Sequence, residues 1–124
     1  MGASLYAPET PLLKQFSTLR VRVRQHNGSD PFVGRRQRQC MLAAGFVRAD
    51  ATASMESAGT LEETRRCAAT WQTQLQGFAR TAIAEGWVDS TAIAAIAAGI
   101  DAWAERPDAF MASTWCEAVG WVTA

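Results

Sequence analysis

Residues 46–63, which read FVRADATASMESAGTLEE, contain the change from a strand pattern of apolar residues to a helix pattern. Apolar and polar residues alternate over residues 46–56, which predicts a strand with one buried face. The residues expected on that face are Val47, Ala49, Ala51, Ala53 and Met55. Thr60 and Glu63 then have the spacing of a capping box and predict the start of a helix. This helix should end at Gly86, because apolar residues recur at three- and four-residue steps up to that point.

Capping and stop signals place three further helices and a second strand around this centre. Threonine and proline before an apolar stripe predict a helix over residues 10–27, although residues 19–24 also alternate and leave a strand as the alternative. An Asp-Pro pair predicts a helix over residues 30–44 that stops at a glycine. A fourth helix, capped by Asp89 or Ser90, should end before Pro107, which pushes Arg106 out of helical geometry. Residues 113–122 alternate and predict the last strand.

The predicted order is therefore helix, helix, strand, helix, helix, strand, after an N-terminal loop over residues 1–9. We expect one α+β domain over residues 1–124, with about four helices packed on a two-stranded sheet. The strand pair is antiparallel or parallel, and we prefer antiparallel. Because a two-stranded ribbon is marginally stable and leaves both edges open, we expect a second copy to complete the sheet edge in a homodimer.

Twelve basic and twelve acidic residues cancel over the whole chain but not within its halves. Residues 1–48 hold eight cations and two carboxylates, whereas residues 49–124 hold four cations and ten carboxylates. This asymmetry indicates either two regions that attract each other, within a chain or between chains, or a nucleic-acid face formed by the arginines of residues 20–48. The first interpretation is preferred, because the net charge is zero and aromatic and basic residues do not alternate regularly around Arg20–Arg38.

The residue inventory excludes several classes of site. Cys40, Cys67 and Cys116 are widely spaced without a C-x-x-C pair, which favours free buried thiols in a reducing compartment. His26 is the only histidine, so H-E-x-x-H sites and most histidine-rich metal centres are excluded. Neither common nucleotide-phosphate loop occurs. Because no apolar stretch is long enough for a membrane span and no signal peptide opens the chain, we expect a soluble, cytoplasmic protein without a metal.

Four polar residues before the first strand are candidates for ligand contact. His26 and Asn27 lie in the loop between the first two helices, and the alternative for them is turn and capping chemistry. Arg35 and Arg36 are suited to hold an anionic ligand or a phosphate backbone. A solvated helix face, or pairing with the acidic half of the chain, is the structural alternative for these two arginines.

Three residues on the last strand form a second group of candidates. Trp115, Glu117 and Trp121 share one strand face, on which two indoles and a carboxylate are suited to line a small-molecule pocket. The alternative is packing in a core or an interface, where a buried Glu117 would need a cationic partner such as Arg35. The remaining helical tryptophans at positions 71 and 103 lie on apolar stripes and are expected in the core.

Five segments, in this order, carry a family resemblance: residues 5–13 (LYAPETPLL), 26–36 (HNGSDPFVGRR), 42–47 (LAAGFV), 103–110 (WAERPDAF) and 115–121 (WCEAVGW). Together they resemble the C-terminal part of class I S-adenosylmethionine-dependent methyltransferases of the UbiE-like (type 11) group. The resemblance covers nearly the whole chain. It implies that the last two strands form an antiparallel hairpin at the edge of a seven-stranded sheet. It also implies that the helices between those strands form part of a lid over the acceptor substrate.

The resemblance further implies that the cofactor-binding residues of this family lie in an N-terminal half, which we expect this chain to lack. No position here matches them, so no catalytic or cofactor-binding residue is assigned, and S-adenosylmethionine is expected only with a partner. The first functional hypothesis is a non-catalytic module that self-associates or binds a small apolar ligand. The second is a fragment that completes a methyltransferase in trans. The third is nucleic-acid binding through the arginine-rich residues 20–48.

Overall fold

The computed structural model describes residues 4–123 and has an α+β fold. The described part of the chain forms four α-helices, one short 3-10 helix and a three-stranded antiparallel sheet in the order β1-β3-β2. The elements are β1 (Ser4–Ala7), α1 (Pro11–His26), η1 (Val33–Arg36), α2 (Gln37–Ala43), β2 (Arg48–Ala58), α3 (Leu61–Ala84), α4 (Ser90–Ala104) and β3 (Phe110–Trp121).

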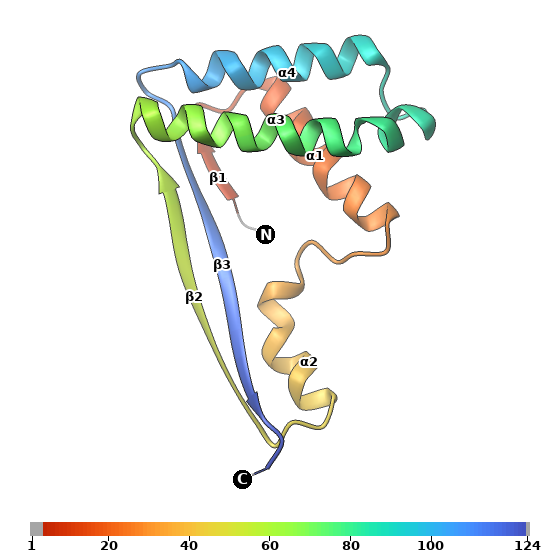
Figure 1. Cartoon of the computed structure of the whole chain (residues 1–124), viewed down its shortest axis with the longest axis vertical. Helices are drawn as coiled ribbons and strands as arrows, with labels where there is room; N and C mark the ends of the chain where they lie inside the picture. Colours follow the sequence, from red (N-terminus) through yellow and green to blue (C-terminus); the bar gives the residue numbers. More distant parts are fainter. Residues whose placement is uncertain (1–3, 124) are drawn as a thin grey trace.

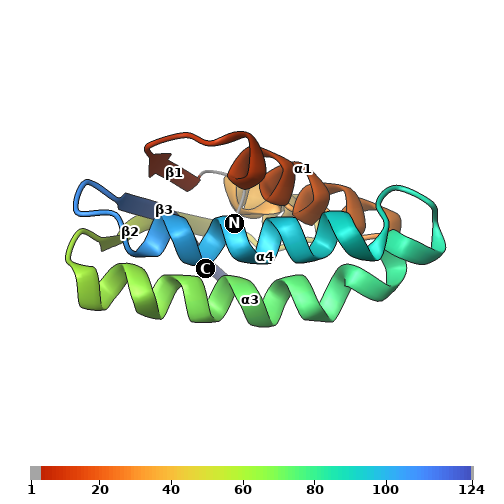
Figure 2. The same ribbon diagram turned by 90° about the horizontal axis from the view of Figure 1, so that it is seen from above.

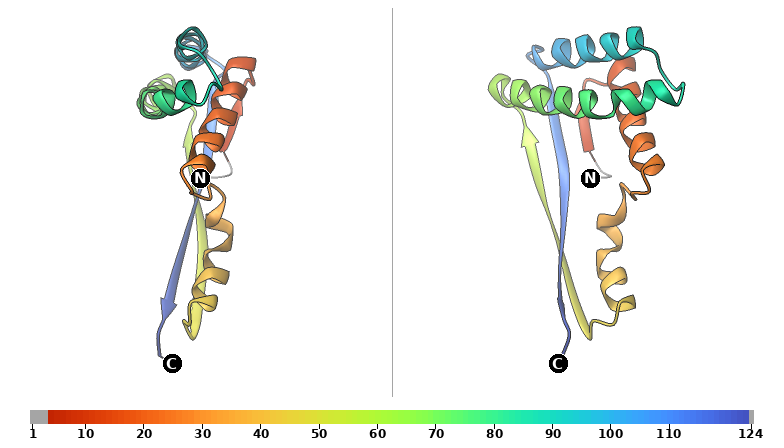
Figure 3. Two further views of the ribbon diagram at one scale, coloured as in Figure 1. Left: turned by 90° about the vertical axis from the view of Figure 1, so that its right-hand side faces the viewer. Right: turned by 45° about the vertical axis from the view of Figure 1, so that its right-hand side comes forward.

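The molecule has a helical layer at one end and a long strand pair that extends from it. Helices α3 and α4 lie side by side across the upper end of the sheet, and α1 packs against both of them (Figures 1 and 2). Strands β2 and β3, which we call the ribbon, run down and away from this layer, and α2 lies along their lower part (Figure 3). The ribbon therefore has one end covered by the helical layer and one end that projects.

The helix starts follow the capping signals of the sequence. Thr10 accepts a hydrogen bond from the backbone of Leu13 at 3.2 Å, and Asp89 accepts one from Ala92 at 2.8 Å. The first, third and fourth predicted helices are confirmed by α1, α3 and α4, and the alternative of a strand over residues 19–24 is wrong. None of the helices described is long and apolar enough to cross a membrane.

The core lies between the three helices of the upper layer. The indoles of Trp71 and Trp103 stack with ring centroids 4.9 Å apart, and Phe16 lies 5.6 Å from Trp71. Both tryptophans are buried, which confirms the prediction that they belong to the core. Thr64, which is also buried, donates a hydrogen bond to the carbonyl of Ala104 at 2.8 Å and thereby joins α3 to the end of α4.

The prediction of two strands and an N-terminal loop is wrong, because residues 4–7 form strand β1 against β3. Of the loop predicted over residues 1–9, the first three residues lie outside the part that the structure describes. Two contacts hold β1 in place: the ring of Tyr6 lies edge-on to Trp71 at 6.4 Å, and the carbonyl of Ala7 accepts a hydrogen bond from the Trp103 indole at 3.0 Å. Four residues are too few for an alternation pattern, so the strand is specified by its pairing with β3 and by these distant contacts.

The second predicted helix is shorter than expected. After a turn in which Asp30 accepts a hydrogen bond from the backbone of Phe32, residues 33–36 form η1, and α2 covers only residues 37–43. Both ribbon strands also have different limits from those predicted, since β2 ends at residue 58 and β3 begins at residue 110. Their antiparallel pairing agrees with the preferred prediction.

The expected buried face of the first predicted strand is mostly wrong. Of its five residues only Ala49 is buried, because α2 is too short to cover more than the lower end of the ribbon. There the packing is close: a Cβ added at Gly120 would lie 2.6 Å from the Phe46 ring, and Arg38 donates a hydrogen bond to the carbonyl of Ala49 at 2.8 Å. Farther up, the alanines and the methionine of that face are exposed.

The three thiols are free but not equally buried. Cys67 is buried in α3, Cys116 is half-buried on β3, and Cys40 is exposed on α2. Burial was expected for all three, and it is wrong for Cys40 because α2 packs against the ribbon through its other residues. Close packing at Cys116 comes from Gly34, where an added Cβ would lie 3.0 Å from the Cys116 Cβ.

Candidate functional site

A cavity of about 430 Å³ lies beneath α3, where this helix crosses the upper part of the ribbon. This volume is within the range of small-molecule sites in proteins. Its wall combines apolar and polar side chains from five elements and includes Arg20, Cys67, Trp71, Gln74, Met111 and Trp115. The cavity is therefore the first candidate for a functional site.

Helical and strand periodicity bring these residues together. Residues 67, 71 and 74 of α3 are spaced by four and three positions, so they lie on one face of the helix, which is directed toward the sheet. Residues 111, 113 and 115 of β3 alternate toward the same side of the sheet. Helix α1 adds Arg20 from the third side. The fold thus places two indoles, a thioether and a guanidinium around one space.

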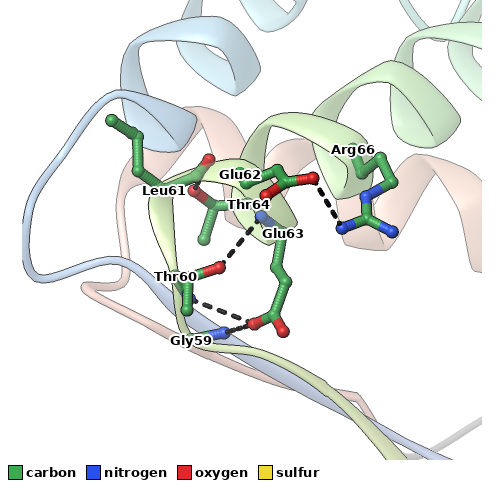
Figure 4. Close-up of polar contacts among 7 residues, drawn as sticks. All are labelled: Gly59, Thr60, Leu61, Glu62, Glu63, Thr64 and Arg66. Carbon is green, nitrogen blue, oxygen red and sulfur yellow. Dashed lines mark hydrogen bonds and ion pairs between the residues drawn. The ribbon is translucent and has the colours of Figure 1, made fainter.

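The capping box of α3 fixes the charged margin of the cavity (Figure 4). One carboxylate oxygen of Glu63 accepts hydrogen bonds from the backbone N–H groups of Gly59 at 2.8 Å and Thr60 at 3.1 Å, and these bonds lower the pKa of Glu63. One turn later, Arg66 lies 3.4 Å from the carboxylate of Glu62. Glu63 and Arg66 are the charged side chains that the start of α3 contributes to the cavity wall. Each of them already has a partner within the protein.

Trp115 is held by a partner on the neighbouring strand. Its indole N–H donates a hydrogen bond to the carboxylate of Glu56 at 2.9 Å, across β2 and β3. Trp115 is 55% exposed even though it lines the cavity, so a large part of the side chain remains accessible. The hydrogen bond orients an exposed aromatic ring and occupies the Glu56 carboxylate at the same time.

Arg20 is the unusual residue of this wall because it is charged and 9% exposed. Burial is the main cause that lowers the pKa of its guanidinium, and the neighbouring Arg24 lowers that pKa further. The guanidinium lies 5.3 Å from the centroid of the Phe16 ring. Among residues 4–123, no carboxylate forms an ion pair with it.

Cys67 lies on the same wall as a protonated thiol. Burial raises the pKa of this thiol to about 11, and the nearby charge of Arg20 opposes the shift only in part. Because the thiolate is the nucleophilic form of cysteine, a thiol with this pKa is a poor nucleophile at neutral pH. Cys67 therefore contributes an apolar surface to the cavity.

The candidates His26 and Asn27 lie away from the cavity, at the C-terminal end of α1. The imidazole of His26 is 3.5 Å from the carboxylate of Glu85 and edge-on to the indole of Trp87, at 5.3 Å between ring centroids. Asn27 is the C-cap residue, and its backbone N–H donates to the carbonyl of Val23. Asn27 thus fits the capping alternative, whereas His26 is the last residue of α1 and contacts the region that follows α3.

Arg35 and Arg36 lie on η1, in a different region from the cavity. Arg36 pairs with Asp30 in the same loop, and the guanidinium of Arg35 lies 5.7 Å from the centroid of the Phe32 ring. The arginines of residues 20–48 are thus distributed over α1, η1, α2 and the start of β2. Several of them are already engaged within their own region of the chain.

Trp115, Glu117 and Trp121 lie on one face of β3, as expected, but only Trp115 reaches the cavity. Trp121 is at the projecting end of the ribbon, where the Arg48 guanidinium lies 4.4 Å from its ring centroid. Glu117 is exposed opposite Thr52 and forms no ion pair with an arginine of the described residues. The structure therefore separates these three residues along the ribbon.

Of the predicted site residues only Trp115 lines the cavity, so sequence reasoning missed most of its wall, including Arg20 and Gln74. Arg20 follows Phe16 by four positions and precedes Val23 by three, so a cation inside this apolar stripe was the available signal. Gln74 carries a buried side-chain oxygen without a hydrogen-bond partner, and no local pattern distinguishes it from other polar residues of α3. Both lie on the same cavity.

The comparisons with known proteins add no family. No protein-family model and no curated protein matches this chain. Within the described residues, no group of three histidine, cysteine, aspartate or glutamate side chains is placed to hold a metal ion. The cavity beneath α3 is therefore the best-supported candidate site in the described part of the chain.

Proposed function

We propose that this chain is a non-catalytic binding module of the methyltransferase C-terminal type, and that the cavity beneath α3 holds a small, largely apolar molecule. The observation that carries this proposal is that Trp71, Met111 and Trp115 line the same cavity of about 430 Å³. Aromatic rings and a thioether provide adaptable apolar contacts, which are typical of small-molecule sites.

The chemistry of the wall favours binding over catalysis. A catalytic nucleophile or base needs a pKa suited to its task, and the Cys67 thiol has a pKa of about 11. The carboxylate of Glu63 accepts hydrogen bonds at the start of α3, and the carboxylate of Glu56 accepts one from the Trp115 indole. The side chains that remain available to a ligand are the hydrogen-bonding groups of Arg20 and Gln74 and the apolar surfaces of the wall.

The strand arrangement supports the relation to methyltransferases. Strands β2 and β3 pair antiparallel, and the two helices between them, α3 and α4, cross above their upper end. The resemblance implies such a hairpin, with inserted helices over the acceptor substrate. A cavity beneath α3 is in keeping with a ligand-binding role for this region.

Two tryptophans on the same face of β3 allow a matched test. We would titrate the protein with 2-naphthoate and 2-naphthamide and follow tryptophan fluorescence and heat. At least one compound should bind, and Trp115→Ala should weaken its binding about 10-fold through the lost ring contact. Trp121→Ala, six residues farther along the strand and outside the cavity wall, should leave binding unchanged. No binding of either compound at millimolar concentration would contradict the proposal.

The open strand edges support a second candidate, which is pairing with a strand of another chain. Within residues 4–123, β3 pairs with β1 only over residues 110–113, so its edge over residues 114–121 has no partner. The outer edge of β2 is also unpaired in the described sheet. Unpaired edges are templates for strand addition. The added strand would come from a second copy, in a homodimer, or from a cofactor-binding chain that completes a methyltransferase.

Mass and activity separate these two partners. A homodimer predicts twice the chain mass by light scattering, and a sharp monomer mass at high concentration would contradict it. Completion in trans predicts that a cofactor-binding chain copurifies from the source cell and that the reconstituted pair transfers a methyl group. A reconstituted pair without transfer would contradict that candidate.

A further inference from the structure

One of the four charged side chains in the cavity wall has no partner of opposite charge or hydrogen-bond partner among the described residues. Glu56 accepts a hydrogen bond from the Trp115 indole, Glu63 caps α3, and Arg66 pairs with Glu62. Of the four charged side chains in the wall, Arg20 alone has no such partner within residues 4–123. A buried guanidinium stays protonated at neutral pH, and it is costly to leave without a counter-charge.

A second polar group without a partner lies in the same wall. The side-chain oxygen of Gln74 is buried and accepts no hydrogen bond from the described residues. Oxygen and nitrogen of a glutamine amide are assigned from their hydrogen-bond partners, so either end of this amide is able to face a ligand. Gln74 projects from α3 and Arg20 from α1, on different sides of one space.

We infer that the ligand of this cavity is a monoanionic carboxylate, with its carboxylate group at Arg20 and Gln74 and its apolar body against Trp71, Met111 and Trp115. This inference rests on the function proposed above. The planar guanidinium donates two parallel hydrogen bonds to a carboxylate, which gives both affinity and orientation. The amide of Gln74 adds a further donor, and the single unpaired positive charge matches a single negative charge.

A phosphate monoester shares the anionic oxygens but carries about two charges at neutral pH. Arg66, the second cation of the wall, already pairs with Glu62, and Arg24, which lowers the pKa of Arg20, does not belong to the wall. The second charge of a phosphate would therefore remain without a partner in the wall. The same cavity should prefer the carboxylate.

The test compares each acid with its own neutral amide. We would measure binding of benzoate, 2-naphthoate and decanoate, and of the three matching primary amides, by calorimetry at constant salt, with 2-naphthyl phosphate as a further probe. At least one carboxylate should bind 10-fold or more tightly than its amide and more tightly than the phosphate. Arg20→Met should remove this preference, and Arg20→Lys should retain part of it. Arg22→Met, on the same helix but outside the cavity wall, should retain all of it.

Each result decides a different point. Equal binding of acid and amide, or a preference that survives in Arg20→Met, would overturn the inference and leave the binding function in place. Tighter binding of the phosphate would overturn the choice of a carboxylate. If none of the seven probes binds at millimolar concentration, the proposed function and this inference both fail. Circular dichroism and thermal melting of each variant establish that it is folded, and Arg20→Lys serves as the charge-retaining variant if Arg20→Met does not fold.

Discussion

Replacing Arg20 by methionine should stabilise the protein in the absence of a ligand. The side chain is 9% exposed and its guanidinium has no carboxylate partner in residues 4–123, so folding removes most of its hydration without compensation. Methionine fills a similar length with apolar atoms. Replacing buried charges by packed apolar groups is often neutral or stabilising by about 1–4 kcal/mol. The lost contact with the Phe16 ring, at 5.3 Å, offsets about 0.5–2 kcal/mol of that gain.

The expected net change is therefore a stabilisation of about 1–2 kcal/mol. A chain of this length has an unfolding entropy of about 0.26 kcal/mol/K, so the midpoint of thermal unfolding should rise by about 4–8 °C. Calorimetry and urea unfolding would measure the change. The control is Arg22→Met on the same helix, where an exposed guanidinium lies 4.2 Å from the Trp87 ring centroid and its removal should cost about 0.5 kcal/mol.

Destabilisation of Arg20→Met by more than 1 kcal/mol, on the order of one lost buried contact, would refute this reasoning. Such a result would mean that the guanidinium stabilises the fold through a partner in the protein and is not free to bind a ligand. Thermal unfolding in the presence of a ligand is an independent test. 2-Naphthoate should raise the unfolding midpoint of the wild-type protein and not that of Arg20→Met.

Three further outcomes follow from particular contacts. Thr64→Val should destabilise the protein by about 1–3 kcal/mol in urea unfolding, because the buried carbonyl of Ala104 loses its donor. Gly120→Ala should cost about 1–3 kcal/mol in the same assay, since its Cβ would lie 2.6 Å from the Phe46 ring. Burial raises the pKa of the Cys67 thiol to about 11, so its alkylation by iodoacetamide at pH 8 should be slow and rise about tenfold per pH unit up to pH 10, as peptide mapping would show.

Each of these outcomes has a matched control. Thr73→Val, whose hydroxyl is exposed, should change stability by less than about 0.5 kcal/mol. Gly77→Ala, with open space around the new Cβ in a helix interior, should stabilise by about 1 kcal/mol. The exposed Cys40 should be alkylated first at pH 8. Equal changes in variant and control, or equal alkylation of the two thiols, would contradict the structural reasons given.

Local signals in the sequence were sufficient for the helices that begin with a capping residue. Thr10, Thr60 and Asp89 each satisfy a backbone donor of the following turn, and this chemistry involves neighbours in the sequence alone. Strand β1 had no such signal, because it depends on pairing with β3 and on a hydrogen bond from Trp103, 96 residues farther along the chain. The burial of Ala51 and Ala53 was overestimated for the same reason, since alternation does not tell how far α2 extends along the ribbon.

The candidate site was predictable only in part. Trp115 was found because alternation places it on a strand face with other aromatic residues, and it does line the cavity. Trp121 follows the same pattern yet lies at the projecting end, because the crossing point of α3 selects the position along the ribbon. The spacing of Arg20 places a cation on the apolar stripe of α1, but neither this spacing nor that of Gln74 tells which element packs against the residue, and the packing of α1 and α3 brings both to the cavity.

The central claim is that a ligand binds between α3 and the ribbon, and the five tryptophans report on it directly. In a ¹H–¹⁵N correlation spectrum each indole N–H gives its own signal. Titration with 2-naphthoate should shift the signals of Trp71 and Trp115, which line the cavity, and leave those of Trp87 and Trp121 in place. Shifts confined to Trp87 and Trp121, or no shift of any indole at millimolar ligand, would contradict the account.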